Sequence, residues 1–135
     1  MGILVLEDEP CVMNLLRFVL NRAGYSVLEA DCAELAKSCA NTTRIRCLIA
    51  DVTAPCYGVS VSADVMAANP LLKIVLISGF SPENWSDRDA ALWDKFPSES
   101  VRVLSKPFKP SDLLSVLNEL IGGPLNATRC RTANG

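Results

Sequence analysis

Histidine is absent from the 135 residues of this sequence. Its absence excludes metal sites built on imidazole, nucleophiles activated by histidine, and a role as a phosphohistidine carrier. An apolar run of about 18 residues is missing too, so we predict no transmembrane helix. The short apolar stretch at the N-terminus meets acidic residues at once, which is not typical of a signal peptide. We therefore expect a cytoplasmic protein.

Paired cysteines are also missing, because none of the six cysteines belongs to a C-x-x-C motif. Without a secretory signal, we expect them to be reduced thiols rather than disulfides. We predict that Cys32, Cys39 and Cys47 are small buried hydrophobic residues. Cys56 and Cys130 are the candidates for more exposed thiols.

The overall composition is that of an ordinary globular domain. Half of the residues are hydrophobic, 21% are charged, and the net charge is −2. The length suits one domain with a sizeable core. The small negative charge, without a basic stripe, argues against a nucleic-acid surface.

Apolar strands and amphipathic helices alternate five times along the chain, which predicts βαβ units: an α/β fold with a doubly wound, five-stranded parallel sheet and helices on both faces. Gly24 is a plausible C-cap, and Asp31 with Glu34 resembles a capping box. Residues 122–135 are predicted to form a flexible tail. The predicted strands are 3–6, 26–30, 46–50, 73–77 and 101–104, and the predicted helices are 10–23, 31–40, 59–68, 81–96 and 110–121.

Three carboxylates and one lysine lie at the ends of these strands. Glu7 and Asp8 follow the first strand, Asp51 ends the third, and Lys106 follows the fifth. Because the carboxyl ends of parallel strands share one crevice, we expect these groups to meet there. Gathered carboxylates repel one another unless a cation joins them, and hard oxygen ligands suit Mg²⁺.

Asp51 is the best candidate for a nucleophile, because a carboxylate can attack a phosphoryl group to give an acyl phosphate. Lys106 suits a phosphoryl oxygen, and the hydroxyl of Ser78, at the end of the fourth strand, can donate to another. Thr53 can offer its backbone carbonyl to a metal. The simpler interpretations are solvated groups at strand ends, and acids that only complement the dipole of the following helix.

Four stretches, in this order on a five-fold β/α chain, resemble the receiver domains of two-component response regulators. They are ILVLEDEP (3–10), LIADVTAP (48–55), IVLISGF (74–80) and LSKPF (104–108). The resemblance covers roughly residues 2–121 and implies a flavodoxin-like receiver domain over residues 1–121. We expect a stand-alone phosphoacceptor rather than an enzyme, because the chain ends soon after the fifth predicted helix and this predicts no DNA-binding or enzymatic output domain.

The resemblance assigns a role to each matching position. The phosphoryl donor would be a histidine of a sensor histidine kinase or a histidine phosphotransfer protein. From the sequence itself we predict that this partner docks beside the first helix, where Phe18 is an unexpectedly large apolar group in a stripe with Cys11, Leu15 and Arg22. The Lys106–Pro107 bond would be cis. Asp51 would be the phosphoacceptor, Asp8 would bind Mg²⁺ directly and Glu7 through water, Thr53 would supply a carbonyl ligand, and Ser78 and Lys106 would contact the phosphoryl oxygens.

The sequence also departs from the family pattern. Val103 stands where receivers usually carry an aromatic residue, the turn at 54–59 is altered, and the stretch from Ser78 to Lys106 is longer than usual. These departures leave open a receiver-like interaction module that does not depend on phosphorylation. A phosphatase of the dehalogenase type is a further alternative, but it needs a second aspartate where Thr53 lies.

Overall fold

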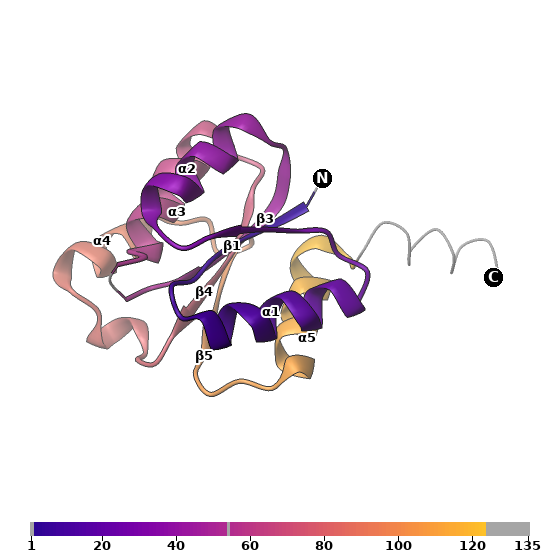
Figure 1. Ribbon diagram of the computed structural model, residues 1–135. Coiled ribbons are helices and arrows are strands. Elements are labelled where there is room, and N and C mark those ends of the chain that lie inside the picture. Colours follow the sequence, from indigo (N-terminus) through magenta and orange to yellow (C-terminus); the bar gives the residue numbers. More distant parts are fainter. Residues whose placement is uncertain (1, 54, 124–135) are drawn as a thin grey trace.

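The computed structural model describes residues 2–53 and 55–123, which form one parallel sheet with helices between the strands (Figure 1). This arrangement confirms the predicted doubly wound α/β fold. The strands are β1 (Gly2–Leu6), β2 (Val27–Ala30), β3 (Ile45–Asp51), β4 (Lys73–Ser78) and β5 (Val101–Ser105). The helices are α1 (Pro10–Arg22), α2 (Ala33–Thr42), α3 (Gly58–Ala68), α4 (Asp87–Lys95) and α5 (Pro110–Ile121), with a 3-10 turn, η1 (Pro82–Asn84), before α4.

The strand order in the sheet is β2-β1-β3-β4-β5. The chain therefore winds outward in opposite directions from β1 and β3, which lie side by side. In a sheet of this kind, a crevice opens outside the carboxyl ends of the strands at the point where the winding reverses. That crevice lies between the residues that follow β1 and those that end β3.

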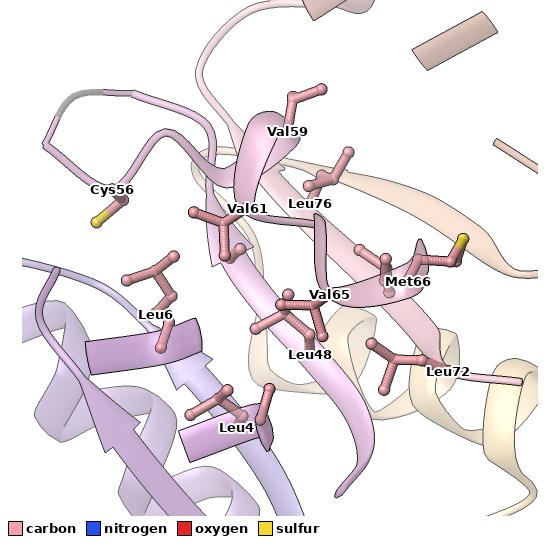
Figure 2. Packing of buried hydrophobic residues seen from close by; sticks show 14 of the residues in the cluster. Leu4, Leu6, Leu48, Cys56, Val59, Val61, Val65, Met66, Leu72 and Leu76 are labelled. Carbon is pink, nitrogen blue, oxygen red and sulfur yellow. The ribbon is translucent and has the colours of Figure 1, made fainter. Parts of the chain in front are cut away.

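Both faces of the sheet are covered, α1 and α5 lying on one and α2, α3 and α4 on the other (Figure 1). Successive strand side chains point to opposite faces, and this explains why the strands are continuous apolar runs. In β1, Ile3 and Val5 pack with α1 and α5. Leu4 and Leu6 pack on the other face, in the cluster that Figure 2 shows with residues of α3.

The predicted helix over 81–96 is divided in the structure. The turn η1 ends at Asn84, Trp85 is extended, and α4 begins only after Ser86. The Ser86 hydroxyl accepts the backbone N–H of Asp89 at 3.1 Å, which is the bond that an N-cap residue makes. Ser86 is therefore the helix start, and the prediction of one continuous helix from Ser81 is wrong.

Two further predictions concern the end of α1 and the start of α2. Gly24 follows α1 with φ of 99°, as a glycine C-cap does. The predicted capping box at Asp31 is wrong, because the N-cap of α2 is Cys32 and no side chain caps it. Most of the predicted tail, residues 124–135 with Cys130, lies outside the described residues. No helix within the described part of the chain is long and apolar enough to cross a membrane.

Candidate functional site

Asp51 is the centre of the crevice and is only 3% exposed. Its Oδ2 accepts a hydrogen bond from Lys106 Nζ at 2.6 Å. Its Oδ1 accepts two more from Thr53, one from the backbone N–H at 2.8 Å and one from the hydroxyl at 2.6 Å. Burial alone raises the pKa of a carboxyl, but these hydrogen bonds outweigh it and hold the Asp51 pKa below its usual value. Asp51 is thus a buried, ionised and oriented carboxylate.

Glu7 is a second buried carboxylate in the crevice, 2% exposed. Its Oε2 accepts the backbone N–H of Asp8 at 3.2 Å, but its Oε1 has no hydrogen-bond partner. The nearest cation is Lys106 Nζ, at 3.9 Å from Oε1. Burial, and then the charge of Asp51, raise the Glu7 pKa to about 7. A buried carboxylate oxygen without a partner is costly, so this position suits a bound cation.

Asp8 completes the acidic part of the site and is exposed at its mouth. One ligand atom of each of Glu7, Asp8 and Cys56 lies within 4.8 Å of the other two. This group provides two carboxylates, which are suitable ligands for a divalent cation such as Mg²⁺. It also contains a thiol that the sequence did not indicate as a ligand.

The prediction that Cys56 is comparatively exposed is wrong. Cys56 is fully buried, and its thiol lies 3.8 Å from Asp8 Oδ1, close enough to donate a weak hydrogen bond. Burial, and then the neighbouring carboxylates, raise the pKa of the Cys56 thiol to about 12. Cys11 is the exposed cysteine among the described residues, and Cys47 is buried as predicted. Cys32 and Cys39 are only partly buried, so the prediction that they are buried is wrong.

The carbonyl of Thr53 is engaged inside its own loop. It accepts the backbone N–H of Cys56 at 3.0 Å and that of Tyr57 at 3.2 Å. Both lone pairs of the oxygen are thus directed at amides. The structure therefore brings Thr53 to Asp51 through its N–H and hydroxyl, while its carbonyl, the predicted metal ligand, is occupied.

Gly58 brings this loop against the end of β3. A Cβ built on Gly58 would lie 2.4 Å from the backbone oxygen of Asp51 and 2.8 Å from its carbonyl carbon. Only glycine can begin α3 at this distance from the strand. The preceding residue, Tyr57, has φ of 50° and is itself in the left-handed region. The close approach fixes the path of the loop that carries Cys56.

Ser78 ends β4 beside the site, but its hydroxyl is fully engaged. Oγ donates to the Phe80 carbonyl at 2.6 Å and accepts the Phe80 N–H at 3.0 Å. It also accepts the indole N–H of Trp85 at 3.1 Å. Trp85 is a residue of the site that the sequence did not indicate as a partner of Ser78, because nothing in its local pattern reports the path of the loop between them.

Lys106 is placed by the end of β5. Its backbone N–H donates to the Ser78 carbonyl at 2.8 Å, and the Lys106–Pro107 bond is cis, which confirms the prediction. Burial opposes its charge, but Asp51 and then Glu7 raise the Lys106 pKa above its ordinary value. The ammonium group is therefore charged and directed at Asp51.

The structure thus brings Glu7, Asp8, Asp51 and Lys106 together and places Ser78 at the same edge of the sheet. A buried carboxylate, a lysine that contacts it and neighbouring acids that could hold a cation form an arrangement that is chemically suited to accept a phosphoryl group. Val103 stands where receivers usually carry an aromatic residue. Its side chain is half-buried and packs against the hydrophobic core. Trp85 and Trp93 contact each other edge to face at 5.6 Å between ring centroids.

Comparison with known proteins agrees with this geometry. The sequence model of the family described as response regulator receiver domain matches residues 3–118. Among solved structures, the chain is similar to chemotaxis protein CheY4 of Vibrio cholerae, with a TM-score of 0.75 and 22% identity over 88% of this chain and 97% of that one. At this identity the likeness is one of fold.

Two other similar structures come from Pseudomonas. The signal receiver domain of an HD domain-containing protein of Pseudomonas fluorescens has a TM-score of 0.76 and 21% identity, over 89% of this chain and 93% of that one. The receiver domain of a sensor histidine kinase of Pseudomonas aeruginosa has a TM-score of 0.73 and 23% identity, over 90% and 97%. The latter structure has a magnesium ion coordinated in its active-site cleft.

Proposed function

The chain belongs to the response regulator receiver domain family, a family of signalling domains of two-component systems, and from this premise we propose that Asp51 is its phosphoacceptor. The observation that carries the proposal is the state of Asp51, a buried carboxylate kept ionised and held by Lys106 and Thr53. The proposed domain is residues 1–121, followed by a tail at 122–135.

The proposed donor is a phosphorylated histidine of a sensor histidine kinase or of a histidine phosphotransfer protein. An Asp51 oxygen attacks the phosphorus, and a new O–P bond forms as the N–P bond breaks. The electron pair of that bond goes to the imidazole nitrogen of the donor. The product is an acyl phosphate on Asp51, which water can later hydrolyse to inorganic phosphate and the free carboxylate.

Lys106 and Ser78 are the proposed contacts of the phosphoryl oxygens. Lys106 already lies 2.6 Å from Asp51 Oδ2, so its ammonium can follow the charge from the carboxylate to the new phosphoryl group. Ser78 can make such a contact only if its hydroxyl leaves the Phe80 carbonyl. Phosphorylation would therefore be coupled to the position of the loop after β4.

The proposed cofactor is Mg²⁺, with Glu7, Asp8 and Asp51 as the residues that would hold it. The unpartnered Oε1 of Glu7 and the nearby carboxylate of Asp8 fit a divalent cation. When bound, the cation offsets the negative charge of the carboxylates and of the incoming phosphoryl group. Thr53 remains in this proposal as a residue that orients Asp51, because its carbonyl is engaged by two amides.

Acetyl phosphate with Mg²⁺ tests the proposal without a partner protein. Intact-mass measurement should show one added phosphoryl group on the wild-type chain and none on Asp51→Asn. Asp94→Asn is the matched control, since Asp94 is an exposed carboxylate on α4, and it should be labelled like the wild type. Equal labelling of wild type and Asp51→Asn would contradict the proposal, and so would no labelling of either.

A further inference from the structure

We propose that Cys56 is a ligand of the divalent-metal site, and that its thiol gives the site a preference for thiophilic cations such as Zn²⁺ and Cd²⁺ over Mg²⁺. The inference rests on the metal site of the proposed function and assigns that site a further residue. It concerns this chain in particular, because the cysteine lies in the altered turn after Asp51.

The position of the Cys56 thiol is compatible with its coordinating a divalent metal ion. Cys56 Sγ lies 3.8 Å from Asp8 Oδ1, and the ligand atoms of Cys56, Asp8 and Glu7 are all within 4.8 Å of one another. Zinc–sulfur bonds of about 2.3 Å and zinc–oxygen bonds of about 2.0–2.2 Å place tetrahedral neighbours about 3.5 Å apart. A cation between these atoms therefore requires only small side-chain movements.

Glu7 gives an independent reason to expect a cation here. Its Oε1 is buried and without a hydrogen-bond partner, and it lies on the crevice side, 3.9 Å from Lys106 Nζ. One lysine must serve both Glu7 and Asp51, and its hydrogen bond goes to Asp51. A metal ion beside Glu7 would supply the missing positive partner.

The loop after β3 provides the Cys56 thiol as a ligand in place of the predicted Thr53 carbonyl. The Thr53 carbonyl is turned into the loop and accepts two backbone N–H groups, one of them from Cys56 itself. The same turn places the Cys56 side chain at the border of the core cluster, on the loop before α3 (Figure 2). The Gly58 contact with Asp51 holds that turn in place.

The donor set decides which cation is preferred. Mg²⁺ demands oxygen ligands and gains little from sulfur, whereas thiolates favour Zn²⁺ and related soft ions. On binding, the Cys56 S–H bond breaks, its proton goes to solvent, and the sulfur electron pair forms the bond to the metal. No electron is transferred, so no oxidant or reductant is needed.

Cadmium titration of the reduced, full-length chain tests the inference, because a sulfur–cadmium bond gives an ultraviolet charge-transfer absorption. Wild type should show the band at one equivalent, and Cys56→Ala should lose it. Cys11→Ala should keep it, since Cys11 is exposed on α1. Zn²⁺ affinity, measured by calorimetry, should fall at least tenfold in Cys56→Ala, and Mg²⁺ affinity should change much less.

Asp8→Asn is the second variant, because Asp8 is exposed and its loss does not disturb the core. It should weaken the cadmium band although every thiol remains. A band that is unchanged in Cys56→Ala would overturn the inference, since the metal would then lie on another cysteine. A band that is unchanged in Asp8→Asn would overturn it too, since the sulfur-bound metal would then lie outside the acidic site. Labelling of the wild-type chain by acetyl phosphate with Mg²⁺ tests the proposed function separately, so the two failures are distinguishable.

Discussion

Trp85 donates its indole N–H to the Ser78 hydroxyl, with 3.1 Å between Nε1 and Oγ. The same N–H lies 3.2 Å from the Phe80 carbonyl, which also accepts the Ser78 hydroxyl proton. Hydrogen bonds among Ser78, Phe80 and Trp85 thus join the start of the loop after β4 to its end. If Ser78 turns toward a phosphoryl group on Asp51, Trp85 loses one of its two acceptors and keeps only the Phe80 carbonyl. A change at Asp51 would then also change the segment before α4.

Tryptophan fluorescence should report this change. Beryllofluoride with Mg²⁺, a stable mimic of the acyl phosphate, is expected to alter the emission of wild type and of Trp93→Phe, which retains Trp85. It should leave Asp51→Asn unchanged, because that variant lacks the carboxylate that binds the mimic. Unchanged emission in the wild type, with unchanged amide exchange over residues 78–96, would indicate a module whose output does not depend on phosphorylation.

Gly58→Ala should destabilise the protein and disturb the site. The added methyl group would lie 2.4 Å from the Asp51 backbone oxygen, so the loop or the strand end must move. We expect a loss of about 1–3 kcal/mol in the free energy of unfolding, measured by urea denaturation, together with slower labelling by acetyl phosphate. Gly79→Ala is the control, because a Cβ there meets no atom within 4 Å. Equal stability of the two variants would contradict the close-packing argument.

Much of the fold could be predicted because its signals are local. Strands buried on both faces are apolar throughout, and the helix α1 repeats its buried residues at helical spacing. The gathering of Glu7, Asp51 and Lys106 was predictable as well, since the carboxyl ends of parallel strands share one edge. The apolar runs, the helical spacing and the charged residues at the strand ends can all be read from the sequence alone.

What could not be predicted depends on the paths of two loops. Cys56 is buried because Gly58 draws its loop against Asp51, and no sequence pattern reports that approach. Trp85 reaches Ser78 because the chain after η1 is extended rather than helical. The sequence does not predict the start of α4, because Ser81-Pro82 and Ser86 both have the residues of a helix start, and only the structure shows which hydroxyl caps a helix.

Asp8→Ala should remove most of the Mg²⁺ binding while leaving the fold intact. Asp8 is exposed and belongs to the acidic group at the mouth of the crevice, so its loss removes a ligand without emptying the core. Calorimetry should show at least a tenfold drop in Mg²⁺ affinity, and chelation of Mg²⁺ by EDTA should prevent labelling of wild type. Asp94→Ala, on exposed α4, should bind Mg²⁺ normally. Unchanged affinity in Asp8→Ala would mean that the acids are structural.

Phe18 should be needed for transfer from a kinase. It is 62% exposed on α1, with Leu15 44% exposed one turn earlier and the Arg22 guanidinium 5.8 Å from its ring centroid. Since α1 begins directly after the acidic residues of the site, we predict that this apolar patch is the docking surface for the protein that carries the donor histidine. Phe18→Ala is expected to slow transfer from the cognate kinase about tenfold, as for a central interface residue.

Two comparisons make the Phe18 prediction specific to docking. Labelling by acetyl phosphate should be the same in Phe18→Ala and wild type, because a small donor needs no protein surface. Leu35→Ala is the matched control, since Leu35 is 44% exposed but lies on α2, on the other face of the sheet. That variant should accept phosphate from the kinase at the wild-type rate. Equal transfer rates for Phe18→Ala and Leu35→Ala, with both variants folded, would show that the kinase docks elsewhere.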